Sequence, residues 1–401
     1  MADEKHKNAG QPGESPAGDS PAGDSPAGVS PAGDTTGIED FQVFLHGQDD
    51  EDEGDAEPWA AQAASESSAG GSAAGANTVV DIVGIGSPVM DLLVNVPYIP
   101  SEEGGMRANE VFHQGGGNCA SAMATAARLG ASVGMIGKVG GDATGDFIIK
   151  DFKYNGVDTS RIVRGAPETS SSYCVAISET DKGTRKFLLR PSTVGRLTPG
   201  EIAYDYIKTA KILHIEAGGD AASLAGAKFA KLNGVTVSID AGYYSKRSEN
   251  LIPYVDIFIA SEFFYKGMFP DDNEPDSYRR NFEKIREIGP SVIWVTLGER
   301  GCIGLVDGVM YEIPSFKVPV KDTTGAGDDF HGAYVAIMLE GLPHDECARH
   351  ASAVSAIKCT FVGGRTGLPD RAMLKRFLED GVLPTAELEE RLEYYRRTFL
   401  Q

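Results

Sequence analysis

The sequence predicts an α/β protein in which a mostly parallel central sheet carries helices on both faces and a small separate β-sheet forms a lid. Two observations support this prediction. From Thr78 onward, short β-branched runs alternate with helix-like stretches, an order typical of strand–helix–strand units with parallel strands. Two pairs of strand-like segments interrupt this order, and a small sheet built from them would lie over the carboxyl ends of the central strands, where ligands bind in open α/β folds.

The local pattern justifies the individual elements. VVDIVGIG, Val79 to Gly86, is β-branched and bounded by glycine, as expected of a buried parallel strand. A helix is expected from Asn118 to Leu129 because its apolar residues recur at helical spacing. The other predicted central strands are Val133–Gly140, Lys211–Glu216, Val235–Asp240, Val255–Ala260 and Val292–Leu297, and a further predicted helix is Ala143–Gly156.

The lid is predicted from about 93–114 and 170–191. Short antiparallel strands are expected at Leu93–Val96 and Arg107–Phe112. A second pair is expected at Ser172–Ser178 and Arg185–Arg190, with the turn ETDKGT between them. Arg190 is interpreted as an exposed strand residue, with a substrate contact as the alternative.

Three regions are expected along the chain. Residues 1–77 are predicted to be a disordered acidic tail, 78–380 the folded domain and 381–401 a C-terminal helical extension. In the tail, SPAGD repeats four times from Ser15 to Asp34, with valine once replacing aspartate, and such a composition buries too little surface to fold. The apolar island Ile38–Leu45 is either a chance cluster or a docking motif.

The formal net charge of -21 is concentrated in the tail. Residues 1–76 hold 16 acidic and 2 basic side chains, net -14, which leaves -7 for the rest of the 401-residue chain. No basic track suited to a phosphate backbone is present, so no nucleic-acid partner is expected. No run of about eighteen apolar residues exists, so no membrane span is expected. Five scattered cysteines and no apolar leader predict a reduced, cytoplasmic protein.

The most informative stretch is KDTTGAGDDFHGAYVAIMLEG, Lys321 to Gly341. The nearly side-chain-free turn from Gly325 to Gly327 precedes an amphipathic helix, and a helix N-terminus with bare amides attracts an anion such as a transferring phosphoryl group. Asp328, in the first turn, is either a helix N-cap or a carboxylate that orients an attacking hydroxyl. The motif G-x-x-x-x-G-K-S/T is missing, and Val89 stands where a dinucleotide-binding fingerprint needs its third glycine, so neither class is supported.

DTTGAGDDFHGAY, which begins at Asp322, resembles the C-terminal signature of the pfkB, or ribokinase-like, carbohydrate kinase family. The resemblance implies a ribokinase-like fold and an ATP-dependent transfer of the γ-phosphate to an alcohol group of a sugar. Asp328 would be the catalytic base. The anion hole would be built from Gly325, Ala326 and Gly327.

The same resemblance bears on three neighbouring positions. Asp322 and Thr324 stand where the family has part of a monovalent-cation site, which would bind K⁺. Asp329 departs from the small or apolar residue usual in the family and is expected to face solvent. His331 is expected to be a packing residue.

GGGNCASAMATAARLG, Gly115 to Gly130, resembles the family's N-terminal signature. By this resemblance the substrate-binding residues are Asp91, Gly116, Gly117 and Asn118. Without it, Asn118 is equally a helix N-cap and Asp91 a solvated loop residue. The spacing resembles most the ketohexokinase-like branch, whose GGN-x-x-N has Ser121 in place of its second asparagine here.

VTLGERGCIG, from Val295, and VGGRTGLP, from Val362, resemble the family's segments beside the nucleotide. They suggest contacts to ATP by Thr296, Gly298, Gly301 and Gly363, although the first segment alone would be interpreted as a simple β-turn. The family's Asn-x-x-Glu near the magnesium ion is replaced by SEFF, which begins at Ser261. Ketohexokinase-like members also lack it, so we interpret the replacement as a property of a subtype.

These observations predict a carbohydrate kinase that uses ATP and Mg²⁺, with K⁺ as a further cofactor. A nucleoside kinase is the alternative within the same chemistry. A catalytically weak regulatory binding protein is the alternative outside it, favoured by the missing Asn-x-x-Glu and the long tail. By analogy with the family, a homodimer through the lid is expected.

Overall fold

The computed structural model describes residues 79–99, 104–181, 184–218, 220–270, 272 and 277–398. The predicted tail, with its SPAGD repeats and the island Ile38–Leu45, lies outside the described residues. No helix among the described residues is long and apolar enough to cross a membrane.

The central sheet confirms the predicted mostly parallel architecture. In the described part of the chain its order is β14-β13-β12-β11-β10-β9-β1-β4-β5, with β6 also paired to β4. All neighbours are parallel except β12–β13 and β13–β14, which are antiparallel. The strands are β1 Ile82–Ile85, β4 Val133–Val139, β5 Val157–Asp158, β6 Ile162–Arg164, β9 Ile212–Glu216, β10 Thr236–Ala241, β11 Ile257–Ser261, β12 Val292–Thr296, β13 Cys302–Val306 and β14 Val309–Ile313.

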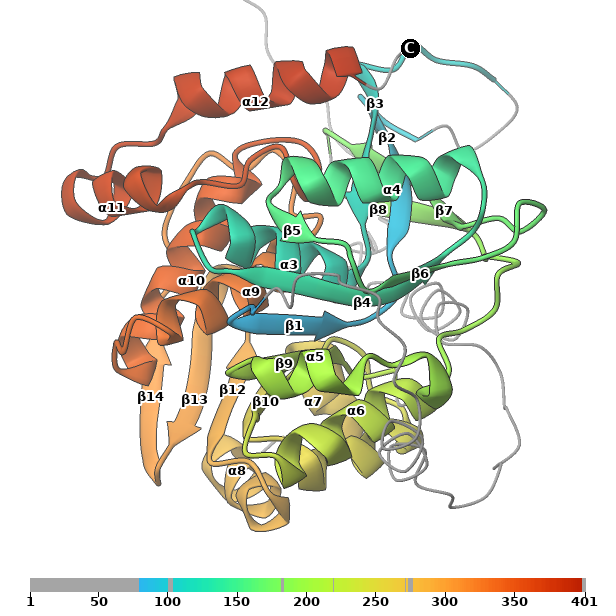
Figure 1. Ribbon diagram of the computed structural model, residues 1–401. Helices are drawn as coiled ribbons and strands as arrows, with labels where there is room; N and C mark the ends of the chain where they lie inside the picture. Colours follow the sequence, from blue (N-terminus) through green and yellow to red (C-terminus); the bar gives the residue numbers. More distant parts are fainter. Residues whose placement is uncertain are drawn as a thin grey trace, which may run out of the picture.

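Successive strand residues point to opposite faces of this sheet, and each face is covered by helices (Figure 1). Ile82 packs in one core and its neighbour Val83 in the other. The first core involves α3 Asn118–Arg128, α4 Ala143–Tyr154, α9 Ala326–Met338, α10 His344–Cys359, α11 Arg371–Asp380 and α12 Thr385–Thr398. The second involves α5 Tyr204–Thr209, α6 Ala221–Leu232, the 3₁₀ segment η2 Lys246–Tyr254, α7 Glu262–Met268 and α8 Ser277–Ile288.

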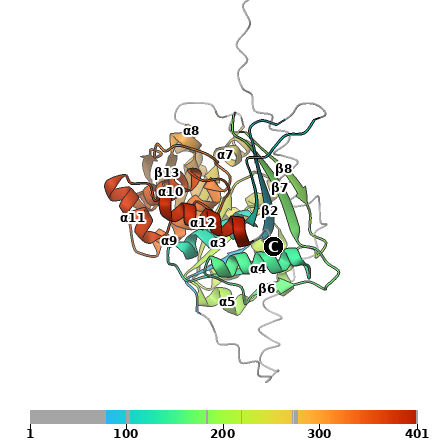
Figure 2. The ribbon, with the colours of Figure 1, turned by 90° about the horizontal axis from the view of Figure 1, so that it is seen from above.

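The predicted separate sheet is present. Its order is β3-β2-β7-β8, with β2 parallel to β7 and the other pairs antiparallel. The strands are β2 Val89–Val96, β3 Glu110–Gly116, β7 Ser172–Glu179 and β8 Arg185–Arg190. Seen from above, β2, β7 and β8 lie on the opposite side of the molecule from α10 and α11 (Figure 2). Strand β2 begins four residues earlier than the sequence predicted, because it pairs on both sides, and it therefore includes Asp91.

The C-terminal segment packs onto the domain. Leu388, Leu392 and Tyr395 of α12 are buried in the core that contains α3 and α9, and the ring of Tyr394 stacks on that of Tyr154 at 3.8 Å between centroids. Helix α12, Thr385–Thr398, lies within the predicted extension 381–401. The boundary at residue 380 stays a prediction.

Candidate active site

Two acidic residues lie at the carboxyl ends of adjacent central strands, the edge at which open α/β folds bind ligands. Glu216 ends β9, and Asp240 lies near the end of β10 beside it. The Glu216 carboxylate accepts hydrogen bonds from the N–H groups of Ser87, at 2.8 Å, and of Cys119, at 3.2 Å. These two hydrogen bonds connect the loop after β1 to the first turn of α3. Burial raises the pKa of Glu216 to about 8 despite these two donors.

Asp91 reaches the same edge from the lid. In the antiparallel register of β2 and β3 it stands opposite Gln114, and a Cβ atom at Gly116 would lie 2.2 Å from an oxygen of the Asp91 carboxylate. Glycine is therefore needed at position 116 to leave space for that carboxylate, and not to make the backbone flexible. Burial raises the pKa of Asp91 to about 6, although the Arg365 guanidinium acts to lower it. Asp91 is thus a strand residue, and the alternative of a solvated loop residue is wrong.

The start of α3 shows why the motif needs glycine at position 117. Gly117 is the N-cap and has φ 94°, in the left-handed region that other residues rarely adopt. Asn118 is the first residue inside the helix, so the alternative that it is the N-cap is wrong. A Cβ atom on Gly242 would lie 3.4 Å from the Asn118 amide nitrogen and 3.3 Å from an Asp240 carboxylate oxygen, which places these two side chains around one glycine.

The start of α9 has the expected bare turn. Its N-cap is Gly325, with φ 77°, and no side chain caps this end of the helix. Asp328 is the third helical residue, so the N-cap interpretation of this aspartate is wrong. The first N–H groups of a helix have no intrahelical partner; that of Ala326 donates to Thr323 O at 3.2 Å, within the turn itself.

The Asp328 side chain is half-buried and lies among other carboxylates. Burial and the charges of Asp240 and Asp91 raise its pKa to about 7, against the lowering effects of His331 and Lys358. His331 lies 3.2 Å from an Asp240 carboxylate oxygen through its Nε2 and is buried. Asp91 of the lid and Asp240 of the sheet therefore lie close enough to Asp328 of α9 for their charges to act on it.

Asp329 does not face solvent, and that expectation is wrong. Its side chain is 0% exposed and accepts a hydrogen bond of 2.7 Å from the Thr125 hydroxyl. The reason is the close packing of α9 on α3, where a Cβ atom on Gly332 would lie 2.0 Å from Ala122 O. Consecutive helical residues point about 100° apart, so Asp329 faces α3 when Asp328 faces the strand ends. Burial raises the pKa of Asp329 well above its ordinary value.

The four residues predicted to contact the nucleotide lie in two places. Thr296 ends β12, and Gly298 and Gly301 bound the turn between β12 and β13, with φ 60° and 91°. Gly363 instead belongs to the loop after α10, where its N–H donates to Asp322 Oδ2 at 2.8 Å. Its neighbour Gly364 lies 3.0 Å from a Cβ built on Gly325, so Gly363 accompanies the α9 turn.

The acid in the SEFF segment is already paired. Glu262 forms ion pairs with Lys266, at 2.7 Å, and with Arg300, at 2.5 Å. Among the described residues, no group of three or more His, Cys, Asp or Glu side chains could hold a metal ion. A Mg²⁺ ion that enters with ATP is carried mainly by the phosphates, as is usual for kinases, so this finding does not conflict with MgATP as a substrate.

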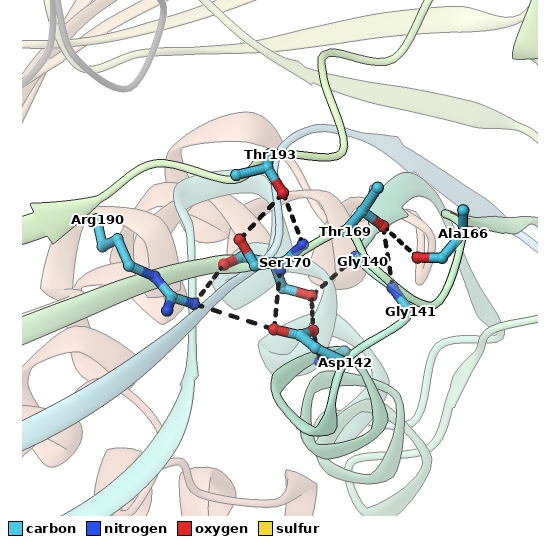
Figure 3. A network of polar contacts seen from close by, with 10 residues as sticks. Gly140, Gly141, Asp142, Ala166, Thr169, Ser170, Arg190 and Thr193 are labelled. Carbon is cyan, nitrogen blue, oxygen red and sulfur yellow. Dashed lines mark hydrogen bonds and ion pairs between the residues drawn. The ribbon is translucent and has the colours of Figure 1, made fainter.

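A polar network fixes the base of the lid (Figure 3). Asp142, the N-cap of α4, accepts hydrogen bonds from Gly145 N at 2.9 Å and from Ser171 Oγ at 2.8 Å. Arg190 donates to Ser171 O at 3.2 Å and lies 3.9 Å from Asp142. The segment GGDATG, Gly140 to Gly145, which follows β4, therefore anchors the start of β7. Arg190 is exposed, as expected, and in this network it contacts Ser171 and Asp142.

Four residues of this region were not predicted from the sequence: Glu216, Asp240, Lys358 and Arg365. For the first two a signal existed, because each acid directly ends a buried β-branched run, KILHIE and VTVSID. Arg365 is 1% exposed and pairs with buried Asp151, while its N–H donates to Gln114 Oε1 at 3.1 Å. Lys358 lies in α10, 0% exposed. Nothing in the local sequence distinguishes these two cations from surface residues.

Comparison with known proteins identifies the family to which this chain belongs. The model of the pfkB family carbohydrate kinases matches residues 80–371. A ribokinase of Lactococcus lactis is 28% identical over 300 residues, 74% of this chain and 96% of the relative, and a nucleoside kinase of Methanothermobacter thermautotrophicus is 24% identical over 307 residues, 74% and 95% of the two chains. The structure of Arabidopsis thaliana ribokinase complexed with ribose and ATP superposes with a TM-score of 0.67 at 23% identity, covering 75% of this chain and 99% of that one. The branch nearest to ketohexokinase stays a prediction. The extent of the family match and the shared fold show that this chain is a carbohydrate kinase of the pfkB family.

Proposed function

We propose that the protein transfers the γ-phosphoryl group of MgATP to an alcohol group of a sugar or sugar-like molecule, with Asp328 as the base. The observation that carries this proposal is the convergence of Asp91, Asp240 and Asp328 beside the N-terminus of α9. The N–H groups of Gly325, Ala326 and Gly327 would hold the charge of the transferring phosphoryl group, with the Ala326 amide exchanging its bond to Thr323 O for one to the phosphate.

The electrostatics of Asp328 suit a base. Its pKa of about 7 gives a mixture of protonated and ionised carboxyl near neutral pH, and general bases work best when their pKa lies near the working pH. In a loose phosphoryl-transfer transition state the carboxylate chiefly orients the hydroxyl and accepts its proton late. The neighbouring positive end of α9 would at the same time stabilise the phosphoryl oxygens.

The other carboxylates favour a polyhydroxyl acceptor. Asp91 offers two acceptor oxygens, a good match for two adjacent hydroxyls, and Asn118 adds a donor and an acceptor beside Asp240. Gly116 and Gly117 would let the substrate approach the backbone. Thr296, Gly298 and Gly301 would contact ATP at the end of β12, and Gly363 would support the phosphate turn. K⁺ is left out of the proposal because the carbonyl groups of its predicted site, at Asp322 and Thr324, are bonded to Lys358.

The test is an ADP-release assay across a panel of pentoses, hexoses, deoxysugar acids and nucleosides. We expect turnover with a sugar, and a loss of at least ~100-fold in kcat for Asp328→Ala with the fold intact. Asp345→Ala is the matched control, because Asp345 is also an acid in the first helical turn, that of α10. Faster turnover of a nucleoside, as the nucleoside kinase relative suggests, would favour that substrate class, and no turnover with intact ATP binding would favour a regulatory protein.

We place the enzyme in the cytoplasm, which the five cysteines support because all are free and buried. We also propose a homodimer through the lid, supported by the edge strand β8 and its Leu188, which is 62% exposed. Light scattering on the protein and on Leu188→Lys would test the dimer, and a monomeric wild-type protein would exclude it.

A further inference from the structure

Lys358 lies where a monovalent cation would be bound. Its ammonium group donates to the backbone carbonyl of Asp322 at 3.0 Å and also to that of Thr324. Both carbonyl groups belong to the turn before α9. The side chain enters from the last turn of α10 and is 0% exposed.

The Asp322 carboxylate is also fully engaged. Oδ1 accepts from Thr324 N at 2.8 Å and from the Thr324 hydroxyl at 2.7 Å, and Oδ2 accepts from Gly363 N at 2.8 Å. Burial alone would raise the pKa of this group, but the Lys358 ammonium and these donors outweigh it and lower the pKa. The carboxylate is therefore a charge partner of Lys358, held in place by the two loops.

The oxygen atoms around Lys358 do not fit a K⁺ site. A potassium ion is held by oxygen atoms that replace its water shell, and here the carbonyl oxygens already accept hydrogen bonds from an ammonium group. A lysine ammonium carries the same single charge and offers three N–H donors. We infer that Lys358 takes the place of the monovalent cation behind the α9 turn, so that this kinase works without K⁺.

The role assigned to Lys358 is that of a positioning residue. Helix α10 contacts the turn through two side chains that lie one helical turn apart. The Ser355 hydroxyl donates to Ala326 O at 2.8 Å, and the Lys358 ammonium donates to the carbonyl oxygens of Asp322 and Thr324. A fixed positive charge at this place also balances the buried acids of the turn. The inference rests on the proposed function to the extent that this turn is the anion hole.

The first experiment uses the wild-type protein. Kinase activity and Tm are measured in K⁺, Na⁺ and tetramethylammonium chloride at equal ionic strength, after removal of K⁺ and NH₄⁺. We expect kcat to agree within about twofold and Tm to be unchanged, because a specifically bound ion would raise Tm by mass action. A rise of Tm specific to K⁺, or a larger activation by K⁺, would overturn the inference.

Two variants of Lys358 separate positioning from general stability. Lys358→Ala opens space beside the carbonyl groups, and its kcat in Na⁺ should fall by about tenfold or more and recover in part with K⁺ or NH₄⁺, together with its Tm. Lys358→Met refills the space without a charge, so neither ion should rescue it. Lys375→Ala, which removes an exposed lysine of α11, is the control and should match the wild type.

The inference would also be refuted if Lys358→Ala kept the wild-type kcat and Tm in Na⁺. It would equally be refuted if K⁺ and NH₄⁺ had the same effect on Lys358→Ala as on Lys358→Met. If Lys358→Ala fails to fold, the wild-type comparison alone still decides the question. If the wild type has no turnover with any sugar or nucleoside in any salt, the proposed function fails, whereas the Tm comparison still tests the place of the cation.

Discussion

Replacing Asp328 with asparagine should abolish catalysis and yet stabilise the protein at neutral and higher pH. Asparagine has nearly the shape of aspartate but cannot ionise or accept a proton from a hydroxyl. We therefore expect kcat to fall by at least about 100-fold. The gain in stability has a different origin, namely the removal of a carboxylate that burial and the charges of Asp240 and Asp91 disfavour in the folded state.

The size of the stability effect follows from the pKa. The pKa of Asp328 rises from 3.8 to about 7 on folding. At ~1.4 kcal/mol for each pKa unit, the upper bound on the change in the free energy of unfolding is about 4 kcal/mol. Solvent reaches part of this side chain, so we expect roughly 1–3 kcal/mol. Between these pKa values the folded state holds more protons than the unfolded state, and the free energy of unfolding of the wild type falls as pH rises.

The assay follows both consequences. Chemical denaturation of wild type and Asp328→Asn at a series of pH values should give similar stabilities near about pH 4, a difference that widens up to about pH 7 and a constant difference above it. The wild-type kcat/KM should rise with pH over the upper part of this range and level off above about pH 7. A stability difference independent of pH would refute the electrostatic reasoning, and retained turnover would remove Asp328 from the role of base.

Three further changes test other parts of the site. Asp91→Asn removes one acceptor oxygen from the proposed sugar contact, so KM for the sugar should rise by about tenfold, and an unchanged KM would exclude that contact. Asp329→Asn should keep the hydrogen bond from Thr125 and leave Tm and kcat close to wild type. Asp329→Lys should lower both, because the side chain is buried; if this variant also matched the wild type, the side chain would face solvent. Gly332→Ala places a Cβ 2.0 Å from a backbone oxygen of α3 and should lower stability by about 1–3 kcal/mol in denaturant unfolding; Gly200→Ala, which meets nothing within 4 Å, is the control.

Much of the fold could be predicted because each element carries its own period. VVDIVGIG and VIWVTL are strands on their composition alone, and the helix after Asp328 shows its apolar face directly in the sequence. The α9 turn could also be predicted, since a glycine pair before an amphipathic helix creates an anion site whatever surrounds it. The strands of the lid were recognised, β8 with its observed bounds but β2 without its first four residues and β3 shifted toward the N-terminus.

The side chains that complete the site could not be predicted in the same way. Lys358, Arg365 and Asp329 are charged residues that local patterns assign to the surface, yet each is nearly or fully buried. They are buried because partners more than 30 residues away in the chain meet them, as Asp322 meets Lys358 and Thr125 meets Asp329.

The sequence by itself determined the class of fold, the family signature and the position of the bare-amide turn, because these depend on residues within a few positions of one another. Only the tertiary structure decided which acids surround Asp328 and that a lysine of α10 lies behind the turn. The free energy of a buried charge depends on the groups that pack around it, and those groups are brought together by the crossing of α9, α10 and the lid, not by their spacing along the chain.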